Sequence, residues 1–549
     1  MDIKKYLIQN KILTVSVGLA LLISLAHVFF CVDVFNDIAG SYGPMAGAFG
    51  AGDWEKAFPE NVPPLLPSLA GSLCMIGINT LTALIIVSSL FYILAIFPLY
   101  HFLKLYLKPE HAAFGCLLYV AAPKIIRFSC TGLPDAGRNF FLITAVWLLL
   151  SYFRKNSAMK LLSLALCLSG LVLIRAEGII YLPLFLAWFI VMHFRTRGTA
   201  PFISSVLALL KKVAIVTVIL LIITSPRMYQ VYSLTGIPAI DSRQSDVISG
   251  LLDFNLPVIQ SDDAVALPEP GARTHHIVVQ RLIVLLECFC SGSYELYLAL
   301  AISGILLLRK RNQITLEHWV AFSFVICNAG IFFVILMSER FFDINTLLLM
   351  PFTVMACLAV YDFICSKGMR AAALSAVAVL VIAQTCVGAN NVFSLKPNDR
   401  AKVGKWIMEK QSGLLQETGK TDIARKIVIL SDKPQYAFWA EAEWAKSTGK
   451  KGQELPALEV LQAQNVDIAV VEKEDSPLFL QIIKSPHFKQ IQTPFYEHTA
   501  VFLFIPDKTA PDYVPSDDAA DDDAKGKLPG KSGSSGTTAQ PSATTEQQP

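Results

Sequence analysis

The chain has 549 residues, of which 54% are hydrophobic and 16% are charged, and its formal net charge is +3. Its apolar residues form continuous blocks close to the ~20 residues that a helix needs to cross a bilayer, which indicates a polytopic membrane protein. The small net charge, with basic residues scattered between these blocks, excludes a nucleic-acid groove.

Near-continuous apolar runs predict a polytopic α-helical fold with about eleven transmembrane spans. The first run follows a lysine-bearing start and lacks a small-x-small cleavage site, so we expect an uncleaved anchor. The spans are expected at 12–32, 73–98, 111–126, 138–153, 160–175, 177–193, 211–226, 292–308, 315–337, 344–364 and 370–388.

Basic residues cluster in alternate gaps between the expected spans, which the positive-inside rule places in the cytoplasm. An odd number of spans then leaves the amino terminus inside and everything after residue 388 outside. We expect a multi-pass membrane protein with a cytoplasmic amino terminus. The clusters are Lys4, Lys5 and Lys11; Lys104 and Lys108; Arg154, Lys155 and Lys160; Arg195, Arg197, Lys211 and Lys212; Arg309, Lys310 and Arg311; Lys367 and Arg370.

Three regions are expected to face outward: the loop 33–72, a loop of roughly 227–291, and the carboxy-terminal segment. The second loop contains an apolar piece, Ile277 to Phe289, that we expect to lie along the membrane surface. The membrane part is assigned to 1–390, an extracytoplasmic α/β domain to 391–507, and a disordered, polar tail to 508–549.

The period of the apolar residues changes within the α/β domain and predicts alternating helices and strands. Helical stretches are expected at Asp399 to Gln411 and at Tyr436 to Lys446. A further short helix should precede the last strand. The strand segments are KIVIL, VDIAVVE and VFLFI.

Asp37 is the first candidate for proton chemistry, because it leaves the first span within a loop rich in glycine and proline. We expect such a loop to have a defined backbone conformation rather than a flexible one. Asp33 lies one helical turn earlier and could pair with Asp37 to hold a metal or a proton. The alternative is that both are polar residues marking the end of a span.

Six cations map to the outer ends of spans, where the positive-inside rule disfavours them. Guanidinium groups there could hold an anionic lipid headgroup. The alternative is snorkelling to phospholipid, or pairing with Glu177 and Glu339. The six are Lys124, Arg127, Arg138, Arg175, Arg227 and Arg340.

Short motifs occur in an order that resembles the dolichyl-phosphate-mannose:protein mannosyltransferase family, with its bacterial aminoarabinose transferase relatives. These are membrane glycosyltransferases of the GT-C fold, like glycosyltransferase family 39. The similarity covers most of residues 1–506. The motifs are Asp37 with Gly52-Asp53-Trp54 and Pro63-Pro64-Leu65; Leu133-Pro134-Asp135 ahead of Phe140-Phe141; Ile174-Arg175-Ala176-Glu177-Gly178; Tyr232 to Gly236; and Ser338-Glu339-Arg340-Phe341.

The resemblance implies that Asp37 acts as a general base or helps to bind the acceptor, and that the sugar donor is a polyprenyl phosphate. It also implies a location in the cytoplasmic (inner) membrane of a bacterium. It also favours Arg175 and Arg340 as ligands of the departing phosphate, with Glu177 orienting Arg175. Two departures from the family, Ile38 and Val62, put shared metal ligation and aminoarabinose specificity in doubt.

Two further residues keep alternative interpretations. Asp135 is either a second acidic group near the site or a carboxylate favoured by a helix N-terminus. Tyr42 could stack on a sugar ring or anchor the protein at the interface. No metal ligand is assigned, because the adjacent His275 and His276 lack a carboxylate at a fitting spacing. The cofactor is unknown, with a divalent metal ion as an option.

The chain contains no GxxxxGK[ST], HExxH, GxSxG or GxGxxG signature of other enzyme classes. We therefore expect a polyprenyl-phosphate-sugar-dependent hexosyl- or pentosyltransferase. Its partners would be the lipid donor, a lipid, glycan or protein acceptor, and membrane lipids. The alternatives are a lipid-linked sugar transporter or flippase, and a non-catalytic envelope assembly factor.

Overall fold

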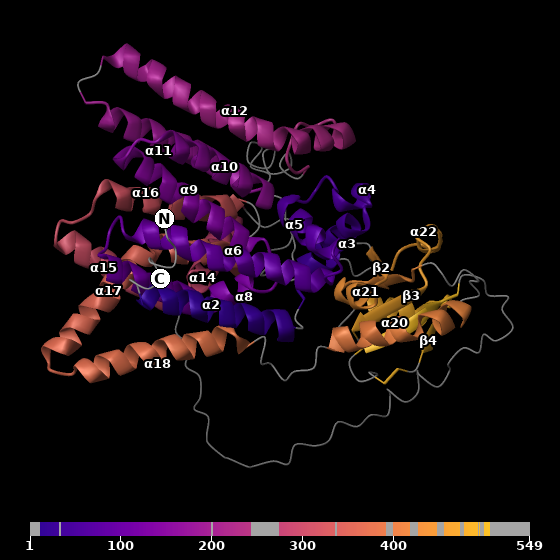
Figure 1. Cartoon of the computed structure of the whole chain (residues 1–549). Helices are drawn as coiled ribbons and strands as arrows, with labels where there is room; N and C mark the ends of the chain where they lie inside the picture. Colours follow the sequence, from indigo (N-terminus) through magenta and orange to yellow (C-terminus); the bar gives the residue numbers. More distant parts are fainter. Residues whose placement is uncertain are drawn as a thin grey trace, which may run out of the picture.

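A computed structural model describes residues 11–31, 34–198, 201–242, 274–334, 338–390, 399–417, 426–446, 455–472, 477–491, 493–494 and 499–505. A large helical region carries a small α/β unit at one end (Figure 1). Asp33 and the expected tail 508–549 lie outside the described residues, as do the side chains of His275 and His276.

Eight helices among the described residues are long and apolar enough to cross a membrane. They are α2 (Lys11–Phe30), α6 (Thr80–Leu103), α9 (Asp135–Arg154), α11 (Gly178–Thr196), α12 (Phe202–Thr235), α16 (Leu316–Val334), α17 (Asp343–Ser366) with the turn η2 (Glu339–Phe342) before it, and α18 (Arg370–Gly388).

Two bent helix pairs raise the number of spans to ten if each pair crosses once. Helices α7 (Pro109–Ala121) and α8 (Pro123–Ser129) meet at 62°, and α14 (Thr274–Gly292) meets α15 (Glu295–Lys310) at 92°. Helix α10 (Ala158–Ile174) is apolar but shorter. Every expected span overlaps one of these helices, but the expected number of eleven is not confirmed.

The apolar piece Ile277 to Phe289 lies within α14, which is a longer helix than expected. Its placement along the membrane surface stays a prediction.

The glycine-rich loop 33–72 is folded into short helices. These are the π-helical turn η1 (Ile38–Tyr42), α3 (Gly43–Ala51), α4 (Trp54–Ala57) and α5 (Leu65–Cys74). Gly52 ends α3 with a left-handed φ of 77°, and Asp53 then caps α4 by accepting a hydrogen bond from the Lys56 amide at 3.2 Å. A Cβ on Gly71 would lie 2.6 Å from Phe49, so α3 and α5 pack closely only because this residue is glycine.

Arg227 of α12 ties the end of this loop to the helical region. Its side chain is buried and donates hydrogen bonds to the carbonyl oxygens of Pro59 (2.7 Å), Val62 (2.9 Å) and Ile240 (3.0 Å). The fork of five N–H donors suits a cluster of carbonyls that no single-donor side chain could satisfy. Neither interpretation made from the sequence, headgroup binding nor snorkelling, describes this contact.

We expect Arg227→Met to loosen the segment 58–62, because each buried carbonyl left without a partner costs ~1–3 kcal/mol. Hydrogen exchange of the amides in this segment should become faster, whereas that of α6 should not change. Arg195→Met, at an exposed position of α11, is the matched control. Equal exchange in the wild type and Arg227→Met would show that the carbonyl contacts do not hold the loop.

The α/β unit is a five-stranded mixed sheet with the order β2-β1-β3-β5-β4. Strand β1 pairs in parallel with β2 and β3, whereas β5 pairs antiparallel with β3 and β4. The strands are β1 (Val428–Ser431), β2 (Glu443–Lys446), β3 (Ile468–Glu472), β4 (Phe488–Ile491) and β5 (Thr499–Phe504).

Helices cover both faces of this sheet, because alternate residues of its inner strands are apolar on each side. Ile429, Ile468 and Val501 face α20 (Asp399–Glu417) and α21 (Gln435–Trp439). Leu430, Val471 and Phe502 face α22 (Leu458–Ala463) and α23 (Pro477–Lys484).

The predicted helix from Tyr436 to Lys446 is wrong in its second half. Helix α21 ends at Trp439, and Glu441 adopts a positive φ of 52° that interrupts the helix. The following residues form β2, which pairs with β1 so that Val428 lies opposite Glu443. An edge strand tolerates charged side chains. Because β2 contains such residues, a search for apolar runs did not predict it as a strand. Strand β4, the opposite edge, was missed for the same reason.

The α/β unit contacts the helical region beside Asp37. The Gln435 amide of α21 donates to the carbonyl of Val34 (3.1 Å) and to Oδ1 of Asn36 (2.5 Å). A Cβ on Gly43 would lie 2.6 Å from the ring of Phe438, so α21 packs directly on η1. The segment that carries Asp37 is therefore positioned by both parts of the chain.

Candidate active site

Asp37 immediately precedes the π-helical turn η1, a rare local structure that is frequent at functional sites. Its carboxylate makes no capping hydrogen bond and is instead paired with the guanidinium of Arg340 in η2. The Asp37 side chain is 43% exposed and that of Arg340 is 17% exposed. An aspartate carboxylate is a group that can serve as a general base.

Arg175 lies between α10 and α11 and is held by two carboxylates. Its Nη1 donates to Asp135 at 2.9 Å, while its Nη2 and Nε donate to the two oxygens of Glu177 at 2.9 and 3.2 Å. Every nitrogen of this guanidinium thus has a carboxylate partner, and Arg175 is 6% exposed. The expected contact between Glu177 and Arg175 is present.

A second buried arginine, Arg138 of α9, pairs with Asp343 at the start of α17. Asn139 donates to the other oxygen of Asp343 at 2.7 Å, and Arg138 lies 3.6 Å from Asp135. The backbone carbonyls of Arg340 and Phe341 accept hydrogen bonds from Arg138 at 3.3 and 3.2 Å. Arg138 therefore fixes the turn that presents Arg340 to Asp37.

Phe341 connects the two arginines predicted from the sequence. The guanidinium carbon of Arg175 lies 4.6 Å from the ring centroid of Phe341, and that of Arg340 lies 5.0 Å from it. Tyr42 is buried and close enough to Arg175 to interact with its charge. The structure thus brings together all six predicted site residues: Asp37, Tyr42, Asp135, Arg175, Glu177 and Arg340.

The carboxylates of this network lie at helix N-termini. Asp135 is the first residue of α9, Glu177 immediately precedes α11, and Asp343 is the first residue of α17. The helix dipole stabilises negative charge at these positions. Both interpretations of Asp135 therefore apply at once, because it begins a helix and also lies within the network. Its Oδ2 atom is buried without a hydrogen-bond partner among the described residues.

Sequence reasoning missed Asp343 and Asn139, and it favoured an ordinary explanation for Arg138. A usable signal was present, because Asp135 and Arg138 are three residues apart and share one face of α9. Asp343 is an acidic residue at the start of an otherwise apolar span, which is a functional signal in membrane proteins. Only the fold shows that these two segments meet.

A polar cavity of about 440 Å³ lies between the helical region and the α/β unit; Arg340 and Asn36, the residue before Asp37, line it, whereas Asp37 is not among its lining residues. Arg340, Arg127, Arg400 and Glu339 contribute charged groups to its wall. Glu339 accepts hydrogen bonds from Lys124 (2.5 Å) and Ser291 (2.6 Å) and lies 3.8 Å from Arg127, so the pairing considered as an alternative for these cations is present. Arg400 of α20 pairs with Glu472 at 2.9 Å.

Within the described part of the chain, no group of three or more His, Cys, Asp or Glu side chains is arranged to hold a metal ion. We therefore assign no step to a metal ion.

The pH dependence of the Arg175–Glu177 pair follows from one pKa. Burial is the largest single influence and raises the pKa of Glu177, but the charge and hydrogen bonds of Arg175, a backbone hydrogen bond and the charge of Arg138 together lower this pKa from 4.5 to about 2. A carboxyl group with a lowered pKa stabilises the folded state above its unfolded pKa, and this contribution is lost as the pH falls from about 4.5 toward 2.

We therefore expect Glu177→Gln to lower the melting temperature by a constant amount between pH 8 and pH 5, with the difference shrinking below about pH 4.5. Melting followed by intrinsic fluorescence checks this. Glu110→Gln, at an exposed position near the start of α7, is the control and should show no such trend. A difference that grows on acidification contradicts the ion pair.

Comparison with known proteins supports the class that the fold suggests. Residues 61–229 match the family model described as dolichyl-phosphate-mannose-protein mannosyltransferase. The match includes Asp135, Arg175 and Glu177, whereas Asp37 and Arg340 lie outside it. No curated protein matches the chain.

Two solved structures share the fold across most of the chain. ArnT from Cupriavidus metallidurans, bound to undecaprenyl phosphate, aligns with a TM-score of 0.60 and 11% identity over 90% of this chain and 98% of that one. The oligosaccharyltransferase AglB from Archaeoglobus fulgidus, in complex with an inhibitory peptide and a dolichol-phosphate, aligns with a TM-score of 0.51 and 13% identity over 89% of this chain and 73% of that one. Identities this low establish the fold alone.

The chain is a polytopic membrane protein of the GT-C fold with a small carboxy-terminal α/β unit. The resemblance to the dolichyl-phosphate-mannose:protein mannosyltransferase family, inferred above from short motifs, is confirmed by the family match. The family and the fold together support a membrane glycosyltransferase.

Proposed function

We propose that this protein transfers a sugar from a polyprenyl-phosphate-linked donor to an acceptor hydroxyl on the outer side of the cytoplasmic membrane. The observation that carries this proposal is the Asp37–Arg340 ion pair: its guanidinium lines a polar cavity, and its carboxylate directly follows Asn36, which lines the same cavity. Sugar transfer from a lipid phosphate needs both: a base for the acceptor proton and positive charge for the departing phosphate.

In the proposed reaction, the acceptor hydroxyl loses its proton to Asp37 and its oxygen attacks the anomeric carbon of the donor. The bond between that carbon and the phosphate oxygen breaks, and the electron pair leaves with the polyprenyl phosphate. The sugar is transferred with inversion. Arg340 stabilises the leaving phosphate by contributing charge-assisted hydrogen bonds.

The pairing of Asp37 with Arg340 supports an order of events in which the donor phosphate binds before Asp37 accepts a proton. Before the donor binds, Arg340 holds the Asp37 carboxylate in an ion pair. A bound phosphate competes for the same guanidinium and releases the carboxylate to accept a proton. The two charged groups would thus change partners in the step that brings donor and acceptor together.

Arg175 was expected to contact the phosphate as well, and this stays a prediction. Its three nitrogens are directed at Asp135 and Glu177, and its positive face lies against Phe341. These contacts support an indirect role for Arg175. It would position the turn that contains Phe341, and its positive charge would make the electrostatic potential at the phosphate more favourable. Asp135 and Glu177 then act as its positioning partners.

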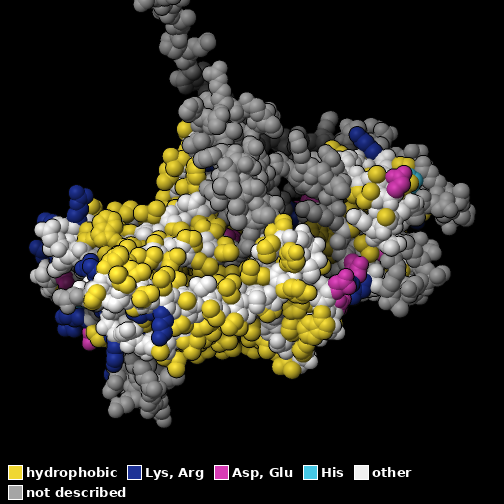
Figure 2. Space-filling model, turned by 90° about the horizontal axis from the view of Figure 1, so that it is seen from above, with side chains coloured by type: hydrophobic (Ala, Val, Ile, Leu, Met, Phe, Trp, Pro, Cys, Tyr) yellow, Lys and Arg dark blue, Asp and Glu magenta, His cyan; other side chains and the backbone are white. Residues whose placement is uncertain are grey.

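The proposed orientation rests on the distribution of charge. Figure 2 shows Lys and Arg side chains gathered mainly at the end of the helical region away from the α/β unit, with hydrophobic side chains covering the surface between the two ends. The positive-inside rule assigns the basic end to the cytoplasm. The polar cavity lined by Arg340 and the α/β unit then face outward. There, α21 and Arg400 can shape the part of the site that receives the acceptor.

Release of polyprenyl phosphate tests the proposal directly. The purified full chain in lipid nanodiscs is incubated with undecaprenyl-phosphate mannose, glucose or aminoarabinose, each labelled in the sugar, together with a membrane extract as a source of acceptors. We expect release of undecaprenyl phosphate with at least one donor and transfer of its label. Unaltered donors in every reaction, together with stable capture of an envelope component, would favour an assembly factor instead.

A further inference from the structure

A second polar cavity lies at the opposite, basic end of the helical region. It has a volume of about 540 Å³ and is formed by the ends of α9 and α11 and the beginning of α12. Its lining includes the cations Arg154, Arg197 and Lys212, and none of the described residues that line it is an aspartate or glutamate. Such a cavity has the electrostatic character of an anion site.

Two of these cations are held by aromatic rings rather than by carboxylates. The guanidinium of Arg197 lies 5.7 Å from the ring centroids of both Phe194 and Phe202, and the ammonium of Lys212 lies 5.6 Å from that of Tyr152. Arg154 differs, because it pairs with Glu317 at 3.0 Å. No carboxylate in the described part of the chain lies within ion-pair distance of Arg197 or Lys212, so their charge is available to a ligand.

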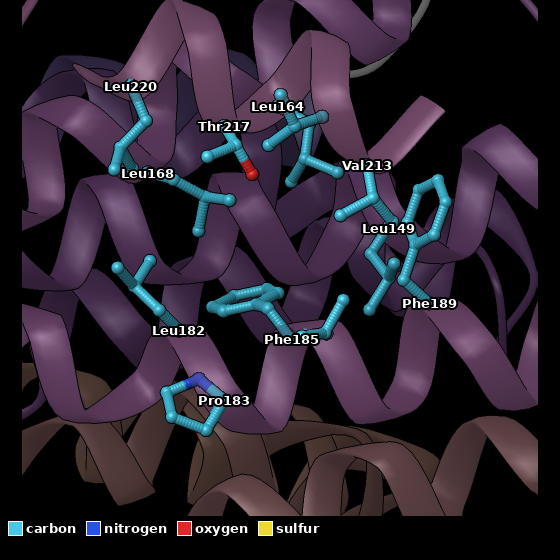
Figure 3. Close-up of a pocket in the computed structure, with 12 residues that line it drawn as sticks. Leu149, Leu164, Leu168, Leu182, Pro183, Phe185, Phe189, Val213, Thr217 and Leu220 are labelled. Atoms are coloured by element: carbon cyan, nitrogen blue, oxygen red, sulfur yellow. The ribbon is translucent and has the colours of Figure 1, made fainter. Parts of the chain in front are cut away.

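A separate apolar cavity of about 320 Å³ lies along the same helices, and its lining residues begin about one helical turn from those of the polar cavity. On α12, Lys212 lines the polar cavity, and Val216 lines the apolar cavity about one helical turn further on. On α11, His193 lines the polar cavity and Phe189 lines the apolar one. Figure 3 shows the leucine and phenylalanine side chains of the apolar cavity directed into the space between the helices, with Thr217 as the labelled side chain that carries an oxygen.

Side chains that line the apolar cavity contact side chains that line the polar one. Phe189 stacks with Tyr152 at a centroid distance of 5.8 Å and contacts Phe153 edge-on at 5.0 Å. The His193 ring forms a hydrogen bond of 2.9 Å with the carbonyl of Ser205, which joins α11 to α12 on the polar side. The charged part and the apolar part are therefore fixed relative to each other.

We propose that this pair of cavities binds one anionic glycerophospholipid from the membrane leaflet at the basic end. Its phosphate lies between Arg197 and Lys212, and part of one acyl chain fills the apolar cavity between α10, α11 and α12. Charge complementarity requires an anion, and the adjoining apolar cavity requires that the anion carry a hydrocarbon chain. This site is separate from the polar cavity lined by Arg340, and its existence does not depend on the proposed transfer reaction.

Native mass spectrometry of the full chain in detergent, with added phosphatidylglycerol or phosphatidylcholine, tests this site. We expect the wild type to retain one phosphatidylglycerol in preference to phosphatidylcholine. Arg197→Gln combined with Lys212→Gln should weaken phosphatidylglycerol binding about tenfold or more, as expected for the loss of charge-assisted bonds. Arg309→Gln combined with Lys310→Gln, at exposed positions of α15, is the matched control and should bind normally.

The apolar part needs its own variant. Val216→Trp fills the apolar cavity and should also reduce phosphatidylglycerol binding, whereas Val218→Trp, at a position that is 52% exposed, should not. Glycerol 3-phosphate, which has the anionic group without the chain, should compete only weakly. Equal binding of phosphatidylcholine, effective competition by glycerol 3-phosphate, or unchanged binding by the Arg197/Lys212 variant would each overturn the proposal.

Discussion

Replacing Asp37 with asparagine is expected to abolish sugar transfer while leaving the protein folded and inserted. Asparagine has the size of aspartate and can still accept a hydrogen bond from Arg340, but it cannot remove a proton from an acceptor. Loss of a general base lowers the rate by ~10²–10⁴-fold. Release of polyprenyl phosphate from the donor identified for the wild type measures the effect.

Asp53→Asn is the matched control, because Asp53 is an exposed carboxylate of the same loop that caps α4 rather than facing Arg340. It should retain most of the activity. The melting temperature of Asp37→Asn should stay close to that of the wild type, since the Asp37 side chain is 43% exposed. Full activity in Asp37→Asn would show that another group takes the proton.

Replacing Arg138 with methionine is expected to have the largest effect on stability. Arg138 and Asp343 are almost fully buried, and removing one partner of a buried ion pair costs ~3–5 kcal/mol because the other charge loses its compensation. The variant should give a low yield and a clearly reduced melting temperature. Lys155→Met, at an exposed position directly after the same helix, should not.

A second substitution separates the ion pair from the shape of the site. Adding Asp343→Asn to Arg138→Met removes the uncompensated carboxylate and should recover part of the lost stability, as measured in a double-mutant cycle. Because the turn η2 would still lack the bonds from Arg138 to its carbonyls, activity should stay low in the double variant. Additive losses of stability would show that the two charges do not interact.

Asp37, Arg175 and Arg340 were recognisable in the sequence for a physical reason. The positive-inside rule disfavours an arginine at the outer end of a span, and Asp37 leaves the first span within a loop rich in glycine and proline, so each of the three required an explanation. The pairing of Arg175 with Glu177 was predictable because the two residues are close in the chain and neither can enter a span alone. The pair between Asp37 and Arg340 joins residues 303 positions apart, and no local pattern predicts it.

The edge strands β2 and β4 show a limit of the same kind. Their residues carry charged and polar groups, and it is the neighbouring strand that makes them strands. The periodicity of apolar residues contains no information about pairing with a neighbouring strand, so it predicts only the strands that are buried on both faces.

The sequence by itself determined that the chain crosses a membrane several times, carries an α/β unit after its last span and places acids and arginines at the ends of its spans. These properties depend on hydrophobic runs and on the cost of charge in a bilayer, which are local. The tertiary structure alone decided which acid meets which arginine, because turns distant in the chain converge on Phe341 and bury Arg138 with Asp343. Burial of a charge is possible only where packing supplies its partner, and packing is a property of the whole fold.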